Sequence, residues 1–197
     1  MYRIKKKRNW STLLVSGSTA VFAIISLISV FISVSTWQTQ REASRPYFTF
    51  RESPLVEITE SLSMEFKFRN VGTHPATDLV SKTMVFNAEL TEPPVLNDIY
   101  SVVNDIPRDT ETSLLVNLDP LDLTPALTEQ AGLSTSNISP YIVVISLQYA
   151  DPILKDAYNQ TIYMKWLGVA NRKVQPLIHV ESREQQSILK FLKDNNF

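Results

Sequence analysis

Residues 62–69 read LSMEFKFR, and this stretch decides the fold class. Apolar and polar residues alternate through it, with Leu62, Met64, Phe66 and Phe68 interleaved with Ser63, Glu65, Lys67 and Arg69. A period of two places alternate side chains on opposite faces of a β-strand. The stretch is therefore predicted to be a strand with one buried face and one wet face, inside a domain built from β-sheet.

Further short strands are predicted on both sides of this stretch. They cover residues 47–51, 77–87, 112–118, 141–149, 160–167 and, as an edge strand containing Pro176, 174–180. The stretches 141–149 and 160–167 are expected to form an antiparallel hairpin. Because no βαβ alternation is present, the pattern predicts a mainly β protein with an antiparallel, immunoglobulin-like β-sandwich.

Helices are expected at three places around these strands. Residues 94–104 carry apolar side chains at helical spacing, and Thr124, Pro125 and Gly132 provide start and stop signals for a second helix. At the C-terminus, residues 182–197 are predicted to form a short amphipathic helix, in which Ser182 and Gln185 form a capping box. Its apolar stripe is Ile188, Leu189, Phe191 and Leu192. Packing onto the domain is the favoured interpretation of this stripe, and docking of a partner is the alternative.

An apolar run precedes the domain. Residues 11–37 read STLLVSGSTAVFAIISLISVFISVSTW and contain no charged residue, with a 22-residue core at 13–34. About 20 such residues cross a bilayer as a helix, so a transmembrane helix is predicted over 11–37. The anchor residues expected to meet lipid or its interface are Trp10, Leu13, Phe22, Ile25, Phe31 and Trp37. A cleaved signal peptide is the rival, but the run exceeds the usual signal core of about 7–15 residues.

Charge predicts the direction of this anchor. Arg3, Lys5, Lys6, Lys7 and Arg8 precede the run, and no acidic residue does. The positive-inside rule then places a basic tail, residues 1–10, in the cytoplasm and the domain outside the cytoplasmic (inner or plasma) membrane. Residues 38–46 are polar and are expected to continue the helix as a connector as far as Pro46, followed by the sandwich at 47–181.

Composition excludes several classes of site. The chain has no cysteine, which rules out disulfides and cysteine-ligated metals. Beyond the basic tail it holds 14 basic and 20 acidic residues, which argues against a nucleic-acid partner. Only four glycines are present, so a glycine-rich phosphate loop is difficult to build.

The segment Asn70-Val71-Gly72-Thr73-His74-Pro75-Ala76, together with the earlier Arg45-Pro46 step, resembles a known kind of protein. It is similar to small single-pass bacterial membrane proteins that carry an immunoglobulin-like, adhesion-type sandwich. The resemblance implies the fold and brings no catalytic residues with it. Physically, Asn70 and Gly72 are expected to adopt left-handed backbone angles and Pro75 to stiffen the exit.

No catalytic, cofactor or metal signature is found in the sequence. His74 and His179 are far apart and are both expected to face solvent. The acidic residues Asp98, Asp105, Asp109, Glu111, Asp119, Asp122 and Glu129 lack a calcium-loop register and predict a solvated surface, with an ion site around Asp119 and Asp122 as the alternative. Four aromatic residues on the two late strands, Tyr141, Tyr149, Tyr163 and Trp166, are expected to fill the core or cover a sheet face, and a binding patch is the alternative.

The function expected from these features is non-enzymatic. A membrane-anchored domain without an active-site pattern is expected to be a binding or accessory protein, in contact with the lipid bilayer and with a membrane-associated protein partner or a second copy of itself. An anchored sensor that binds a ligand or ion is the first alternative. A hydrolase with an unrecognised site is the second.

Overall fold

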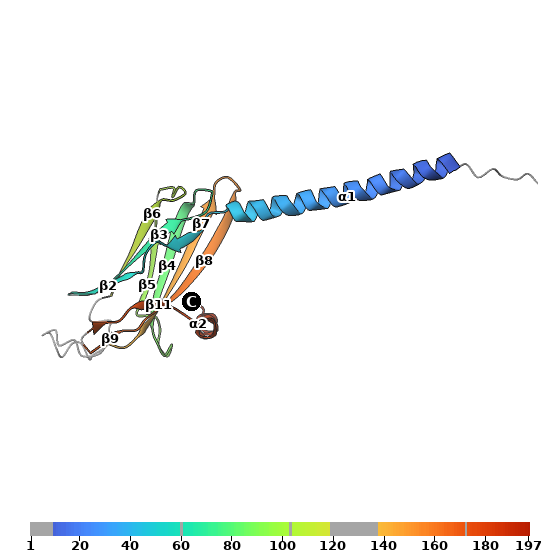
Figure 1. Ribbon diagram of the computed structural model, residues 1–197. Helices are drawn as coiled ribbons and strands as arrows, with labels where there is room; N and C mark the ends of the chain where they lie inside the picture. Colours follow the sequence, from blue (N-terminus) through green and yellow to red (C-terminus); the bar gives the residue numbers. More distant parts are fainter. Residues whose placement is uncertain (1–9, 60, 103, 119–137, 172) are drawn as a thin grey trace, which may run out of the picture. The chain divides into compact units, whose positions relative to one another are not determined.

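The computed structural model describes residues 10–59, 61–102, 104–118, 138–171 and 173–197. The chain divides into two compact units, Met1–Ser44 and Arg45–Phe197. The first unit contains one long apolar helix, and the second is mainly β, with antiparallel sheets and a short C-terminal helix (Figure 1).

Helix α1 (Trp10–Ser44) runs without interruption through the apolar stretch and the polar residues after it. Hydroxyl groups within it donate to carbonyl oxygens one turn earlier, as Thr19 does to Val15 and Ser33 to Ser29, both at 2.8 Å. These bonds satisfy the hydroxyls without water, so serine and threonine are compatible with an apolar helix. By length and composition, α1 is able to cross a membrane.

The first sheet of the second unit is organised around β3 (Leu62–Asn70). Strands β1 (Phe48–Phe50) and β2 (Leu55–Ile58) pair with the two ends of β3 along one of its edges, and β6 (Glu111–Leu118) pairs along the other. All these pairings are antiparallel. The sequence interpretation did not include β2.

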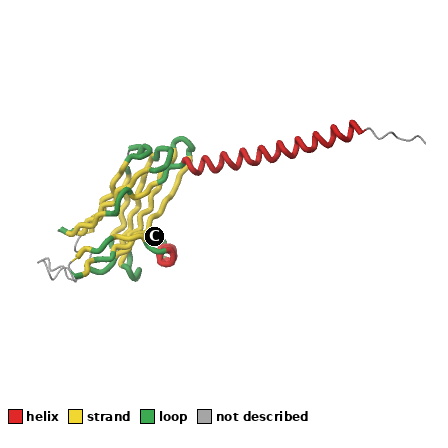
Figure 2. Tube along the Cα trace, in the orientation of Figure 1, coloured by secondary structure: helices red, strands yellow, loops and turns green. Residues whose placement is uncertain are grey.

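The second sheet has the order β11-β8-β7-β4-β5. Its strands are β4 (Thr77–Asn87), β5 (Leu96–Ser101), β7 (Tyr141–Asp151), β8 (Asp156–Trp166) and β11 (Leu177–His179). Strands β7 and β8 form the predicted hairpin, and β11 is an edge strand preceded by Pro176. A small ladder of β9 (Val169–Ala170) and β10 (Lys173–Val174) lies apart from both sheets in the pairing scheme. The extended segments dominate the domain in Figure 2.

The main core lies between the two sheets, as the alternation in β3 predicts. Leu62, Met64, Phe66 and Phe68 are each at most 2% exposed. They share one cluster with side chains of the other sheet, including Val85, Val143, Ile145, Met164 and Trp166. The sandwich is therefore held by apolar burial between facing sheets.

A second, smaller core lies on the other face of the second sheet. Helix α2 (Ser182–Asp194) covers Met84, Phe86, Ile142 and Val144 there with Ile188, which is fully buried. The rings of Phe86 and Phe191 meet edge to face, with centroids 5.6 Å apart. The predicted helix is present, but its N-cap is Glu181, which makes no side-chain capping bond, and so the predicted capping box of Ser182 and Gln185 is wrong.

The helix predicted at residues 94–104 is also wrong. Residues Leu96–Ser101 form β5, which pairs in antiparallel fashion with Val80–Val85 of β4. The segment is so short that the spacing of its apolar residues fits either a helix or a strand. Its pairing with β4 makes it a strand. The helix predicted at 124–132 lies outside the described residues.

Candidate functional site

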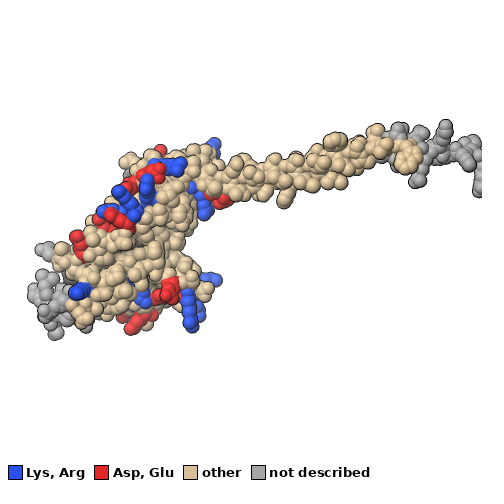
Figure 3. Space-filling model, in the orientation of Figure 1, with Lys and Arg blue, Asp and Glu red and all other residues tan. Residues whose placement is uncertain are grey.

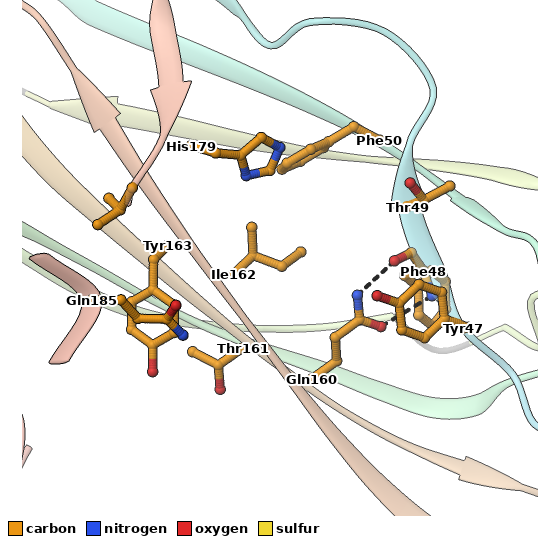
Figure 4. Close-up of a pocket in the computed structure, with 11 residues that line it drawn as sticks. Tyr47, Phe48, Thr49, Phe50, Gln160, Thr161, Ile162, Tyr163, His179 and Gln185 are labelled. Atoms are coloured by element: carbon orange, nitrogen blue, oxygen red, sulfur yellow. Dashed lines mark hydrogen bonds between the residues drawn. The ribbon is translucent and has the colours of Figure 1, made fainter. Parts of the chain in front are cut away.

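A groove opens on one side of the sandwich, between β1 of the first sheet and β8 and β11 of the second (Figure 4). It encloses about 420 Å³. Its lining consists of Tyr47, Phe48, Thr49, Phe50, Gln160, Thr161, Ile162, Tyr163, His179, Val180 and Gln185. The groove therefore joins three parts of the chain that are distant in sequence.

Gln160 fixes one end of this groove. Its side-chain Oε1 accepts from the backbone N–H of Phe48 at 3.1 Å, and its Nε2 donates to the Phe48 carbonyl at 2.6 Å. Figure 4 shows the amide aimed at this strand. The pair satisfies both outward main-chain groups of Phe48 and ties the short strand β1 to the opposite sheet.

The remainder of the groove combines aromatic side chains with aliphatic, hydroxyl and amide side chains. The rings of Phe50 and His179 lie 5.7 Å apart between centroids. Burial raises the pKa of Tyr163, and a hydrogen bond with Thr161 offsets this rise only in part, so the phenol is neutral at pH 7. No Asp, Glu, Lys or Arg is among the lining residues. Such a surface offers apolar contact and neutral hydrogen bonds.

The charges of the domain gather elsewhere. The outer face of the first sheet carries ion pairs between Lys67 and Glu52 at 2.7 Å and between Arg69 and Asp109 at 3.2 Å. Basic and acidic side chains lie next to one another on this part of the surface in Figure 3. Exposed pairs of this kind contribute little to stability, and they give this face a mixed, solvated character.

A buried pair that the sequence did not predict joins His74 and Asp151. His74 Nδ1 lies 2.7 Å from Asp151 Oδ2, and their side chains are 16% and 0% exposed. The other carboxylate oxygen accepts from the backbone N–H groups of Ile153 at 2.8 Å and Leu154 at 3.0 Å. The expectation that His74 faces solvent is therefore wrong, because the β7–β8 turn brings Asp151 to it from 77 residues away.

This pair predicts a pH dependence of stability. Burial of Asp151 opposes its ionisation, but the N–H of Leu154, His74 and the N–H of Ile153 together outweigh burial and hold its pKa below the ordinary 3.8. A lowered pKa stabilises the fold above pH 3.8, and this contribution is lost as the pH falls through the folded-state pKa. We expect Asp151→Asn to lower the free energy of unfolding by about 1.5–3 kcal/mol at pH 7 and by progressively less below pH 4.

Urea unfolding of the full-length protein in detergent, followed by near-ultraviolet circular dichroism between pH 3 and 7, measures this effect. Asp105→Asn removes one carboxylate from an exposed position and is the matched control. Equal pH profiles for the Asp151 variant and the wild type would show that the pair contributes nothing.

Asn70 organises the point where the chain enters the domain. It is fully buried, accepts from the N–H groups of Tyr47 at 3.2 Å and Gly72 at 3.0 Å, and donates to the carbonyls of His74 at 2.9 Å and Ile106 at 3.1 Å. Neither Asn70 nor Gly72 has a positive φ, so the predicted left-handed angles are wrong. Gly72 is needed because a Cβ there would overlap the backbone of Arg45 and Pro46.

The residues predicted to anchor or to bind lie as follows. In α1, the side chains of Trp10, Phe22, Ile25, Phe31 and Trp37 are exposed, and Leu13 belongs to the same helix. The topology residues Arg3, Lys5, Lys6, Lys7 and Arg8 lie outside the described residues. In α2, Ile188 is buried and Phe191 and Leu192 pack beside it on the chain's own sheet, which leaves Leu189 as the exposed member of the stripe, at 47%.

The remaining candidates are the acidic residues weighed as metal ligands, the histidines and the aromatic residues of the late strands. Among the described residues, no group of three or more His, Asp or Glu side chains is placed to hold a metal ion. Asp119, Asp122 and Glu129 lie outside them. Tyr141, Tyr149 and Trp166 are core residues, as expected. Tyr163 is partly buried against the second core and also lines the groove. His179 is exposed, as expected, and also borders the groove.

Comparison with known proteins gives similarity in structure without similarity in sequence. No family model and no curated protein matches the chain. The solution structure of AT1g01470 from Arabidopsis thaliana is similar at 12% identity, with a TM-score of 0.43, over 70% of this chain and 84% of that one. The β-glucosidase 3B of Thermotoga neapolitana, solved with α-D-glucose, is similar at 12% identity, with a TM-score of 0.33, over 59% of this chain. This chain spans only 16% of the glucosidase, so the likeness transfers no activity.

Proposed function

We propose that this protein is a membrane-anchored, non-enzymatic binding protein. Its β-sandwich engages a protein partner in or beside the membrane, as a subunit of a complex or by self-association. The observation that carries the proposal is the open, partly aromatic groove between β1 and β8, which no Asp, Glu, Lys or Arg lines. Aromatic side chains next to polar groups without formal charge are typical of protein-binding surfaces.

Anchoring is supported by the composition of α1. Its apolar residues are exposed in the structure, as in Phe22 at 69% and Phe31 at 74%, and a bilayer would cover them. The five basic residues before it favour a cytoplasmic tail and an extracytoplasmic domain in the cytoplasmic membrane. The apolar core at 13–34 has 22 residues, more than the usual signal-peptide core of about 7–15, which favours an uncleaved anchor.

The strand order supports a finer assignment of the fold. The first sheet has β1 and β2 beside β3 and then β6, and the second has β8, β7, β4 and β5 in sequence. This is the A-B-E and G-F-C arrangement of immunoglobulin-like sandwiches, with an added strand next to C. Such domains bind partners with loops, faces or edges, so the fold is compatible with the proposed role.

Purification of the full-length chain in mild detergent tests the function. We expect the chain to be recovered with a partner or a second copy in fixed stoichiometry, measured by the mass of the complex after subtraction of bound detergent. Residues 1–45 fused to an unrelated soluble domain provide the control for binding through the anchor alone. Repeated recovery of a monomer without a partner would contradict the proposal.

Binding of a small ligand is the second candidate function, and the groove volume of about 420 Å³ favours it. Small-molecule sites commonly occupy about 300–1,000 Å³. Thermal-shift measurements on the full-length chain with calcium and common metabolites would then show a raised unfolding temperature. An unchanged unfolding temperature with all of them would count against a small ligand, and protein binding would remain as the proposed function.

A further inference from the structure

Strand β8 has an outer edge that its neighbour covers only in part. The strand spans Asp156–Trp166, but β11 pairs with it only from Met164 to Trp166. One further bond, from the N–H of Val180 to the carbonyl of Tyr163 at 3.1 Å, ends this contact. Among the described residues, no strand pairs with this edge of β8 before Tyr163.

The direction of the main-chain groups along this edge follows from the pairing. The Tyr163 carbonyl and the Leu167 N–H both bond toward β11. Since the two sides of a strand alternate and the β7–β8 register has no bulge, the N–H and C=O groups of Ala157, Asn159 and Thr161 point the same way. No described strand or side chain bonds these groups, so they form an open row of donors and acceptors.

The usual protection of an edge strand is missing from this part of β8. Residues 157–163 read AYNQTIY and include no proline and no charged side chain, and the register opposite β7 is regular throughout. Natural proteins usually block such edges with charge, proline or bulges. Strand β5, at the other edge of the same sheet, carries such a charge in Asp98. The edge of β6 leads into residues 119–137, outside the described part of the chain.

The groove lies beside this open row. Gln160, Thr161, Ile162 and Tyr163 of β8 form one wall of the groove, and β1 forms the other. A strand placed in line with β11 would lie over the groove, and its alternate side chains would point into it (Figure 4). The open main-chain groups of β8 would provide affinity, and the groove would select among the side chains of the bound strand. These are the two elements of recognition by strand addition.

We propose that the partner contributes an extended segment that adds to β8 at residues 157–163, antiparallel to β8 and in line with β11. This deepens the proposed function and rests on it. The segment would continue the existing β8–β11 ladder, and only a polypeptide in the extended conformation can form such a ladder with β8. Because the groove lining contains no Asp, Glu, Lys or Arg, the side chains of the segment that face the groove are apolar or neutral. The residues whose N–H groups bond to β8 are not proline, since proline has no backbone N–H.

A photo-crosslinking experiment in cells tests the proposal with the full-length chain. Benzoyl-phenylalanine replaces Asn159 on the open edge and, as a control, Gln148, its cross-strand neighbour on β7. Thr161→Pro removes an outward N–H without removing a bond to β7, and Thr161→Val keeps the N–H but deletes the hydroxyl. We expect adducts from position 159 only, mapped to one continuous partner segment, reduced about tenfold or more by Thr161→Pro and little by Thr161→Val.

The outcomes separate this proposal from the proposed function. Unchanged adducts with Thr161→Pro, or adducts to a second copy of this chain, would overturn strand addition by a partner. A partner recovered in detergent without an adduct at position 159 would overturn it too and leave the proposed function intact. Absence of both partner and adduct would overturn both. Circular dichroism verifies that Thr161→Pro folds, and Ala157→Pro replaces it if it does not.

Discussion

Two arginines placed in the middle of α1 are expected to release the protein from the membrane. Ile25→Arg together with Ile28→Arg puts two charges where both side chains are more than half exposed on an apolar helix. An arginine at the centre of a transmembrane helix costs about 2.5–3.5 kcal/mol, and an isoleucine contributes about 0.3–0.6 kcal/mol in the opposite direction. The two substitutions together therefore make insertion less favourable by about 6–8 kcal/mol. Alkaline carbonate extraction should move the double variant from the membrane pellet to the soluble fraction.

A control for charge alone uses the same helix beyond the apolar run. Gln38→Arg together with Gln40→Arg adds two arginines at exposed polar positions of α1, and the protein should remain in the pellet. Extraction of the wild-type chain, or recovery of a wild-type chain that begins after Ser35, would contradict an uncleaved anchor.

Asn70→Asp is expected to cause the largest loss of domain stability from an isosteric change. The amide nitrogen of Asn70 donates to the part-buried carbonyl of His74 at 2.9 Å and to the buried carbonyl of Ile106 at 3.1 Å, and aspartate would face both with a carboxylate oxygen. Both acceptors then lose their donor, at about 1–3 kcal/mol each, and repulsion between the carboxylate and the carbonyl oxygens adds to this. We expect a loss of about 3–5 kcal/mol in the free energy of unfolding at pH 7.

Asn117→Asp makes the same chemical change at an exposed position of β6. It should alter the free energy of unfolding by less than about 0.5 kcal/mol. Denaturant unfolding of both variants, under the conditions used for Asp151→Asn, gives the comparison. A loss below about 1 kcal/mol for Asn70→Asp would mean that the network does not hold the entry of the chain.

Local patterns were sufficient for the elements whose periodicity is unambiguous. The alternation in β3 predicted both the strand and its buried face, and the apolar stripe of α2 predicted its helix and its packing. Prediction failed where local spacing fits two structures. Residues 96–101 have apolar positions compatible with helix or strand, and only their pairing with β4, which is a tertiary contact, makes them β5.

The groove could not be predicted because its parts are far apart in the sequence. Gln160 and Phe48 are separated by 112 residues, and the β8 edge is visible only when the extent of β11 is known. Asn70 and Gly72 show a different limit. The sequence marked them as a turn, yet their role is to accommodate and bond residues 45–47, which no turn preference encodes.

The link between Gln160 and Phe48 has a consequence for the order in which the protein is made. Strand β1 is synthesised directly after α1. The outward N–H and C=O of Phe48, however, can bond to the side-chain amide of Gln160 only after residue 160 has been synthesised. The Pro46 carbonyl likewise accepts its hydrogen bond from the hydroxyl of Tyr149, which is synthesised 103 residues later. Contacts over such separations are slow to form. The segment nearest the anchor is therefore among the first translated, and it pairs with β3 well before its bonds to β7 and β8 are available. Nascent chains that end before β8 would hold it on the first sheet alone.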